Sequence, residues 1–173
     1  KVFVDLKFFD VPQTVQSAVR ALSKHGAAFA TIHGNDSIMA AAAKDKGDMK
    51  VLAVTMLTSL DEGDVRDLGF QVDVKDIVLS RAKRALQLGC DGVISSGLEV
   101  SELRRHLGDN FIVVTPGIRP VKNTDDQKRT VDVEEAFQNG ADYIVVGRPI
   151  KEHANPKQAA ADIQQRIRKI FSS

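Results

Sequence analysis

Cysteine, tryptophan, long apolar runs and an excess of one charge are all missing or nearly missing from this 173-residue sequence. Cys90 is the only cysteine, which excludes a disulfide framework and leads us to expect a reducing, cytoplasmic location. A net charge of +1 and 5% aromatic residues argue against a nucleic-acid partner. No apolar run approaches the ~20 residues of a membrane span, and no signal peptide is visible, so we expect no membrane partner. The remaining composition, 43% hydrophobic and 27% charged, is that of a globular domain.

Short apolar runs alternate with stretches of helical periodicity along the whole chain. The strand-like runs are Val2–Asp5, Phe29–Ile32, Val51–Thr55, Gly92–Ser95, Phe111–Val114 and Tyr143–Val146. These runs are continuously apolar, as in parallel strands that are buried on both faces. The pattern predicts about six βα units in one α/β domain over residues 1–173. Two closures are possible: an open doubly wound sheet, or a (β/α)8 TIM barrel that lacks its first two units.

Helix-start signals mark the beginnings of three helices in the second half of the chain. We expect Asp73 to cap a long helix that ends before Gly89, and Asp132 with Glu135 to begin another. Asn155 followed by proline opens the last helix. The polar stretch 115–130 is the one long loop, and such loops are usually functional. Because Lys1 already lies inside a strand-like run, we expect the natural chain to begin upstream.

Two glycine–arginine pairs follow the last two predicted strands. Gly117 and Arg119 lie in "TPGIRP", and Gly147 and Arg148 lie in "GRP". Glycine lets backbone amides approach an anion, and the arginine fork donates to phosphate oxygens. The loops after the last two strands of such barrels commonly hold phosphate. We therefore predict a phosphate site, with two exposed loop arginines as the alternative.

The opening stretch "VFVDLKFFDVPQT" places three charges at the end of an apolar run. Because side chains alternate along a strand, Asp5 and Lys7 should point the same way, with Asp10 in the following loop. A charged catalytic cluster and a structural ion pair both explain the pattern. His33, at another strand end, either lines the pocket or fills the top of the barrel. No metal-ligand spacing or nucleotide fingerprint is present, so we expect chemistry without metal or cofactor, and Cys90 as a small buried residue.

These segments together resemble the orotidine 5′-phosphate decarboxylase family. "DLKFFDVPQT" is similar to its D-x-K-x-x-D-x-P-x-T signature, and "TPGIRP", "DDQKR" and "VVGRP" resemble its phosphate segments in the same order. "VTMLTS" is similar to its pyrimidine-side segment, and the short loop after Arg119 resembles the bacterial branch. The resemblance implies a (β/α)8 barrel that converts orotidine 5′-phosphate to UMP and CO2 in pyrimidine biosynthesis, without a cofactor. It also implies that two further βα units precede Lys1.

The resemblance also implies a role for each matching residue. Lys7 would protonate C6 of the pyrimidine, with Asp5 and Asp10 in the charged network around it. Asp10 and Thr14 would reach the neighbouring active site of a homodimer. The implied substrate-binding residues are Thr14, Thr58 and Ser59 and, for the phosphate, Arg119, Gln127, Gly147 and Arg148.

Three other functions stay open on the sequence. A related sugar-phosphate lyase, such as 3-keto-gulonate 6-phosphate decarboxylase or hexulose-phosphate synthase, shares the acids and lysine but depends on magnesium. In those enzymes Ala-Gly usually follows the second acid, where this chain has Val-Pro-Gln-Thr. An inactive phosphate-ligand-binding fragment would bind nucleotide without turnover. A structural half-barrel would work only with a partner chain.

Overall fold

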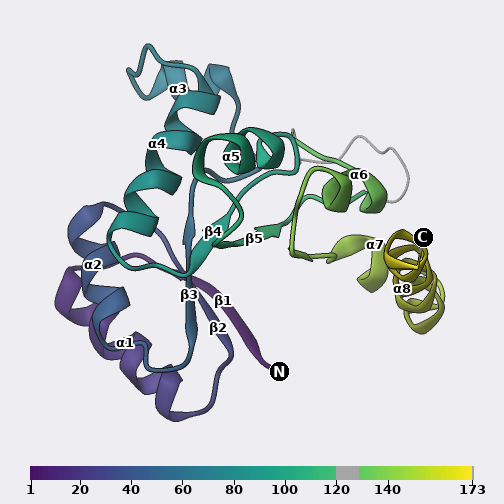
Figure 1. The fold of residues 1–173 in the computed structure, drawn as a ribbon, viewed down its shortest axis with the longest axis horizontal. Coiled ribbons are helices and arrows are strands. Elements are labelled where there is room, and N and C mark those ends of the chain that lie inside the picture. Colours follow the sequence, from purple (N-terminus) through teal and green to yellow (C-terminus); the bar gives the residue numbers. More distant parts are fainter. Residues whose placement is uncertain (120–128, 173) are drawn as a thin grey trace.

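The computed structural model describes residues 1–119 and 129–172, which form one sheet of six parallel strands flanked by helices (Figure 1). The strands are β1 (Phe3–Phe8), β2 (Phe29–Ile32), β3 (Lys50–Val54), β4 (Gly92–Ile94), β5 (Ile112–Thr115) and β6 (Tyr143–Ile144). The helices are α1 (Pro12–Lys24), α2 (Asp36–Lys44), α3 (Glu62–Asp67), α4 (Val74–Gln87), α5 (Val100–Leu107), α6 (Val133–Gln138), α7 (Arg148–Lys151) and α8 (Pro156–Phe171).

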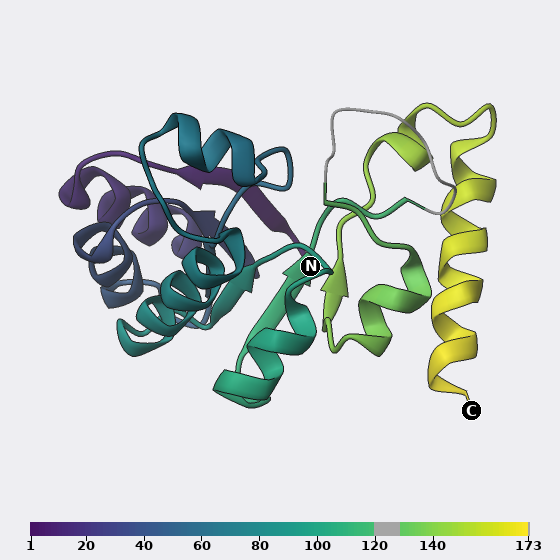
Figure 2. The ribbon, with the colours of Figure 1, turned by 90° about the horizontal axis from the view of Figure 1, so that it is seen from above.

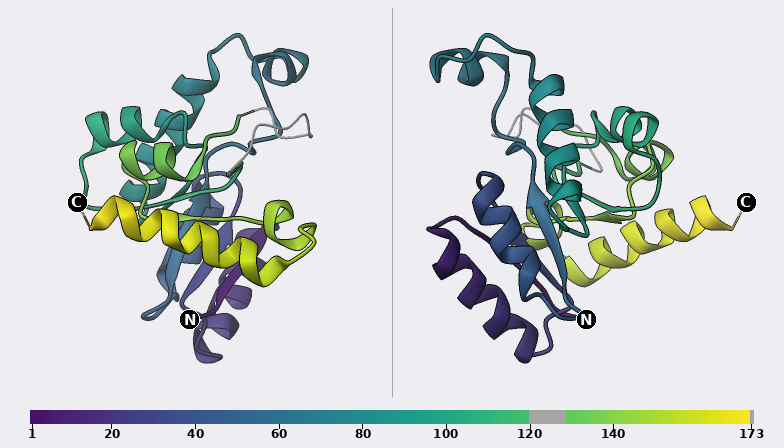
Figure 3. Two further views of the ribbon diagram at one scale, coloured as in Figure 1. Left: turned by 90° about the vertical axis from the view of Figure 1, so that its right-hand side faces the viewer. Right: turned by 60° about the vertical axis from the view of Figure 1, so that its left-hand side comes forward.

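The strand order decides between the two predicted closures. The strands follow one another across the sheet in sequence order, β1 to β6. A doubly wound sheet reverses its order at a switch point, whereas consecutive right-handed crossovers place every helix on one face. The sheet is therefore a curled, open part of a (β/α) barrel. Seen from above, α1 and α2 lie at one end of this arc and α8 at the other (Figure 2). Helices α1 and α8 also lie on opposite sides in the right-hand view of Figure 3.

Both faces of the sheet are buried, as the continuous apolar runs predicted. In β3, Val51 and Ala53 pack outward against the helices. Leu52 and Val54 point into the concave face, where they pack with Ile94 and Val114 of β4 and β5. Alternate residues of β3 thus belong to two different cores, one on each face of the sheet. The concave core forms the floor beneath the carboxyl ends of the strands.

All the expected strands and helices are present, but some bounds differ: β1 runs to Phe8 and not to Asp5. Helices α3 and α7 were not predicted, and β6 ends at Ile144 instead of Val146. Asp73 stands at the N-cap position of α4, as predicted, but its side chain makes no capping hydrogen bond. The amide of Val74 donates instead to Oε1 of Glu62, 2.9 Å away in α3. Asp132 and Asn155 accept the predicted capping bonds. In the described part of the chain, no helix is long and apolar enough to cross a bilayer.

Candidate active site at the carboxyl ends of the strands

A cavity of about 260 Å³ opens at the carboxyl ends of the strands. Its walls come from β1 and from the segments that follow β3, β5 and β6. The lining residues are Phe3, Asp5, Lys7, Val54, Met56, Leu57, Thr58, Ser59, Ile94, Pro116, Gly117, Arg119, Val145, Gly147 and Arg148. The cavity therefore gathers most of the predicted site residues, from segments more than 100 residues apart, and combines an apolar floor with a charged rim.

Lys7 and Asp5 form a salt bridge on the wall that β1 supplies. The Lys7 Nζ atom lies 2.8 Å from Oδ2 of Asp5, and both side chains are 37% exposed. A pair exposed to this degree is screened by water and contributes about 0–1 kcal/mol to stability. A structural ion pair is thus a weak explanation for these charges. The ammonium group is instead held at the cavity by its neighbour.

The backbone at Lys7 is irregular. Its φ is 49°, in the left-handed region that residues with side chains rarely adopt, and the β1–β2 register shifts between Val4 and Phe8. Such a conformation costs of order 1–3 kcal/mol and persists only where the surroundings hold it. Here the amide of Lys7 donates to the hydroxyl of Thr31 (2.9 Å), and that hydroxyl donates to Oδ1 of Asp5 (2.8 Å). Thr31 thereby joins the lysine backbone to the carboxylate.

Sequence reasoning missed Thr31, which is fully buried. The available signal was a hydroxyl inside the otherwise apolar run "FATI". A buried hydroxyl requires a hydrogen-bond partner, and in a central strand the backbone is already paired. The hydroxyl therefore indicated a nearby hydrogen-bond partner, which the structure identifies as the Asp5 carboxylate.

Asp10 and Thr14 lie outside the cavity of their own chain. The Asp10 carboxylate is exposed and accepts a hydrogen bond from the Val11 amide at 2.6 Å. Thr14 is exposed in the first turn of α1. Among the described residues, Asp5 alone forms an ion pair with Lys7. Any contact of Asp10 or Thr14 with an active site must therefore be made elsewhere than in this cavity.

The residues predicted to bind phosphate line the part of the cavity that the segments after β5 and β6 supply. Gly117 has a φ of 75°, so the turn that carries Arg119 uses a conformation glycine adopts readily. Arg119 is buried and donates to the Ile118 carbonyl at 2.9 Å, and Arg148 is partly buried. The alternative of two exposed loop arginines is therefore wrong. Gln127 lies outside the described residues.

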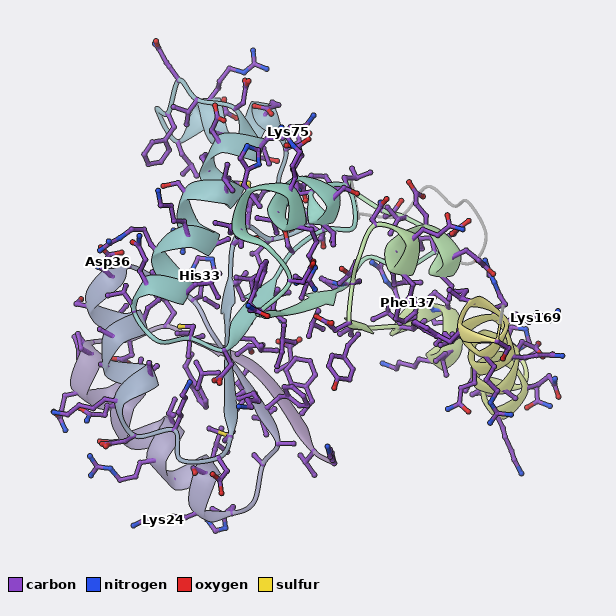
Figure 4. The ribbon with its side chains drawn as sticks, viewed as in Figure 1. Lys24, His33, Asp36, Lys75, Phe137 and Lys169 are labelled. Carbon is purple, nitrogen blue, oxygen red and sulfur yellow. The ribbon has the colours of Figure 1, made fainter. Side chains whose placement is uncertain are left out.

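His33 lies outside this cavity and lines a second, largely apolar one of about 510 Å³. Figure 4 shows it near α2 and α4. Burial, followed by the charges of Arg81 and Lys7, lowers the pKa of the His33 imidazole. The ring is therefore neutral at neutral pH and packs edge-on against Phe9, with ring centroids 5.5 Å apart.

Comparison with known proteins indicates the family of this chain. The family model described as "Orotidine 5′-phosphate decarboxylase / HUMPS family" matches residues 1–163. An orotidine 5′-phosphate decarboxylase of Methylococcus capsulatus is 64% identical over 175 residues, which cover 100% of this chain and 72% of that protein. One from Nitrobacter winogradskyi is 48% identical, over 94% of this chain and 69% of that protein.

A solved structure gives the same result for the fold. The crystal structure of orotidine 5′-phosphate decarboxylase from Lactobacillus acidophilus superimposes with a TM-score of 0.81 at 38% identity. The match covers 95% of this chain and 74% of that one. With the family model matching nearly the whole length, the chain belongs to the orotidine 5′-phosphate decarboxylase / HUMPS family.

Proposed function

We propose that the protein is an orotidine 5′-phosphate decarboxylase of pyrimidine biosynthesis, in which Lys7 protonates C6 of the pyrimidine as CO2 leaves. The observation that carries this proposal is the Asp5–Lys7 pair, which shares one cavity with Arg119 and Arg148. The relatives reported above carry the name of this activity, and their matches cover between 94% and 100% of the chain. The proposed chemistry uses side chains of this site and no added cofactor.

Loss of CO2 leaves an electron pair at C6 of the ring. A fixed ammonium group at that position stabilises the developing negative charge and then donates its proton to form UMP. Asp5 keeps the amine of Lys7 beside it through the 2.8 Å salt bridge, and Thr31 holds Asp5 in turn. The charge is therefore in place before the substrate arrives, so little reorganisation is needed during the reaction.

The phosphate and the ring bind at different walls in this proposal. Arg119, Gly147 and Arg148 hold the phosphate, together with Gln127. Thr58 and Ser59 contact the pyrimidine from the segment after β3. Because the phosphate is remote from the reacting carbon, its binding energy serves to hold the ring against Lys7.

We also propose a cytoplasmic homodimer in which Asp10 and Thr14 reach the partner's active site. Neither residue lines the cavity of its own chain. On either side of Asp10, in the loop after β1, the residues Phe9 and Val11 are 70% and 62% exposed. Large apolar groups clustered at one place on a surface favour burial against another protein. A second copy with its own Lys7 cavity is the partner that gives Asp10 and Thr14 a function.

The test is an assay of orotidine 5′-phosphate decarboxylation. The substrate's loss of absorbance is recorded with EDTA present. We expect turnover that EDTA does not reduce. Turnover of a sugar phosphate that magnesium restores, with none of orotidine 5′-phosphate, would identify the related lyase instead. Binding of UMP without turnover would identify a phosphate-ligand-binding protein.

A further inference from the structure

A buried ion pair lies beside the cavity and contributes no atom to its lining. Glu99, at the start of α5, is 4% exposed, and Arg129 is 7% exposed. The Nη1 atom of Arg129 donates to Oε1 of Glu99 at 2.8 Å. Neither residue appears in the proposed mechanism. Arg129 ends the segment "DDQKR", but the sequence patterns assigned it no role, and no pattern included Glu99.

Arg129 also binds the segment that follows β3. Its Nη2 atom donates to the carbonyls of Leu57 (3.0 Å) and Met56 (3.3 Å). Its own amide donates to the carbonyl of Thr58 at 3.3 Å. Three consecutive carbonyls thus accept hydrogen bonds from one residue. Met56, Leu57 and Thr58 all line the cavity.

The same short stretch connects to the ends of β4 and β5. The Ser96 hydroxyl, just after β4, donates to the carbonyl of Arg129 at 3.3 Å. Two residues further on, the carbonyl of Val131 accepts from the amide of Arg119 at 3.0 Å. Arg129 therefore lies where the segments after three neighbouring strands meet.

Stability alone is a weak reason for such a pair. Removing two charges from water is costly, and an apolar pair of similar volume is often as stabilising. Burial raises the pKa of the Glu99 carboxyl, against the opposing effect of Arg129 and Ser96. What an apolar pair cannot supply is the fixed fork of donors that reaches Glu99 and two carbonyls at once.

We propose that Arg129, oriented by Glu99, is a positioning residue that fixes the Met56–Ser59 segment and so holds Thr58 and Ser59 against the pyrimidine. This inference rests on the proposed function. It assigns the pair to the ring side of the site, since the guanidinium contacts the segment after β3. Loss of the pair should therefore affect substrates with and without a phosphate equally.

The first experiment replaces the Glu99–Arg129 ion pair by two apolar residues, in the double variant Glu99→Leu/Arg129→Met of the full chain. We expect the midpoint of thermal unfolding to stay near that of the wild type. The kcat/KM for orotidine 5′-phosphate should fall about 100-fold, and the kcat/KM for orotidine by the same factor. If the double variant fails to fold, Arg129→Lys takes its place, because lysine keeps the charge and lacks the fork.

Arg104→Met is the matched control. Arg104 also binds a carboxylate, Asp142, and two carbonyls, those of Gly140 and Phe111, and none of its partners lines the cavity. Its replacement should lower the midpoint of thermal unfolding and leave kcat/KM of the folded protein unchanged. The inference would be overturned if Arg104→Met lost as much kcat/KM as the double variant. It would also be overturned if the double variant lost kcat/KM for orotidine 5′-phosphate and not for orotidine.

A second readout does not depend on activity. The Leu60 amide, one residue beyond the Met56–Ser59 segment, donates to the Leu57 carbonyl within that segment at 3.0 Å. Its hydrogen exchange should accelerate in the Glu99 and Arg129 variants and stay unchanged in Arg104→Met. Unchanged exchange at Leu60 overturns the positioning role. An inactive wild type with this exchange pattern would overturn only the proposed function.

Discussion

At the scale of single residues, the site depends on a threonine that holds a lysine in an unfavourable backbone conformation. The alternation of side chains predicted that Asp5 and Lys7 share one wall, and the structure confirms it. The φ of 49° at Lys7 was not predictable, because the hydroxyl that sustains it lies 24 residues away on β2. The hydroxyl in the run "FATI" indicates that a partner is needed, but no local pattern tells which residue of another strand supplies it.

Thr31→Val tests this arrangement with a nearly isosteric side chain. The amide of Lys7 and the carboxylate of Asp5 would each lose a partner, which should cost about 1–3 kcal/mol in the free energy of unfolding. We expect kcat to fall between about 10-fold and 100-fold, because the ammonium group is no longer fixed. Steady-state kinetics and urea unfolding measure the two effects.

Thr55→Val is the control for that substitution. Thr55 is also buried and donates to the Ile94 carbonyl at 2.9 Å, and it does not line the catalytic cavity. We expect a similar loss of stability with kcat nearly unchanged. Equal kcat values for the two variants would contradict the role of Thr31.

The buried carboxyl of Glu99 gives stability a predictable pH dependence. Burial raises its pKa in the folded state, so the folded protein holds this proton more tightly than the unfolded chain does. The contribution of Glu99 is therefore fully present below the ordinary glutamate pKa and is lost as the pH rises through the raised value. Urea unfolding across this range should show the wild type losing stability relative to Glu99→Gln. A wild type that gains stability relative to the variant would contradict the raised pKa.

At the scale of elements, the long apolar patterns were predictable and the short polar helices were not. Helices α3 and α7 span six and four residues, too few for an apolar period to appear. The capping pair Asp61 and Asp64 was the available signal for α3. Asp73 was assigned as a cap because it stands at the right position, but Glu62 of α3 supplies the bond.

The start of α4 should therefore depend on Glu62 and not on Asp73. Glu62→Ala leaves the Val74 amide without its acceptor, and we expect a loss of about 1 kcal/mol in the free energy of unfolding. Asp73→Ala should change it by less than about 0.5 kcal/mol. Urea unfolding of both variants makes the comparison, and the reverse order of losses would show that the sequence-based assignment was right.

At the scale of the whole molecule, periodicity predicted six βα units and left the closure open. The family resemblance implied the barrel, and the consecutive order of the strands, which is set by pairing between residues far apart in the chain, confirms it. The site was predictable where it follows strand ends, as at Arg119 and Arg148. The contacts by which one loop segment holds another, such as those of Arg129 with Met56 and Leu57, were not predictable.

The proposed homodimer predicts that Phe9 contributes to the subunit interface and that Phe171 does not. Phe9→Asp places a charge in the loop that also carries Val11, so burying that surface becomes costly. We expect sedimentation velocity to show monomers, with activity per chain reduced. Phe171→Asp changes an equally exposed ring, 70% in both cases, on α8, and should stay dimeric. A dimer that survives Phe9→Asp would place the interface elsewhere.

The central claim is that the ammonium group of Lys7 delivers the proton, and the most direct measurement compares Lys7→Ala with Lys24→Ala. Lys24 lies at the far end of α1 in Figure 4. Turnover of orotidine 5′-phosphate should vanish in Lys7→Ala while UMP binding stays measurable, and Lys24→Ala should match the wild type. Appreciable turnover by Lys7→Ala would contradict the account and require another proton donor.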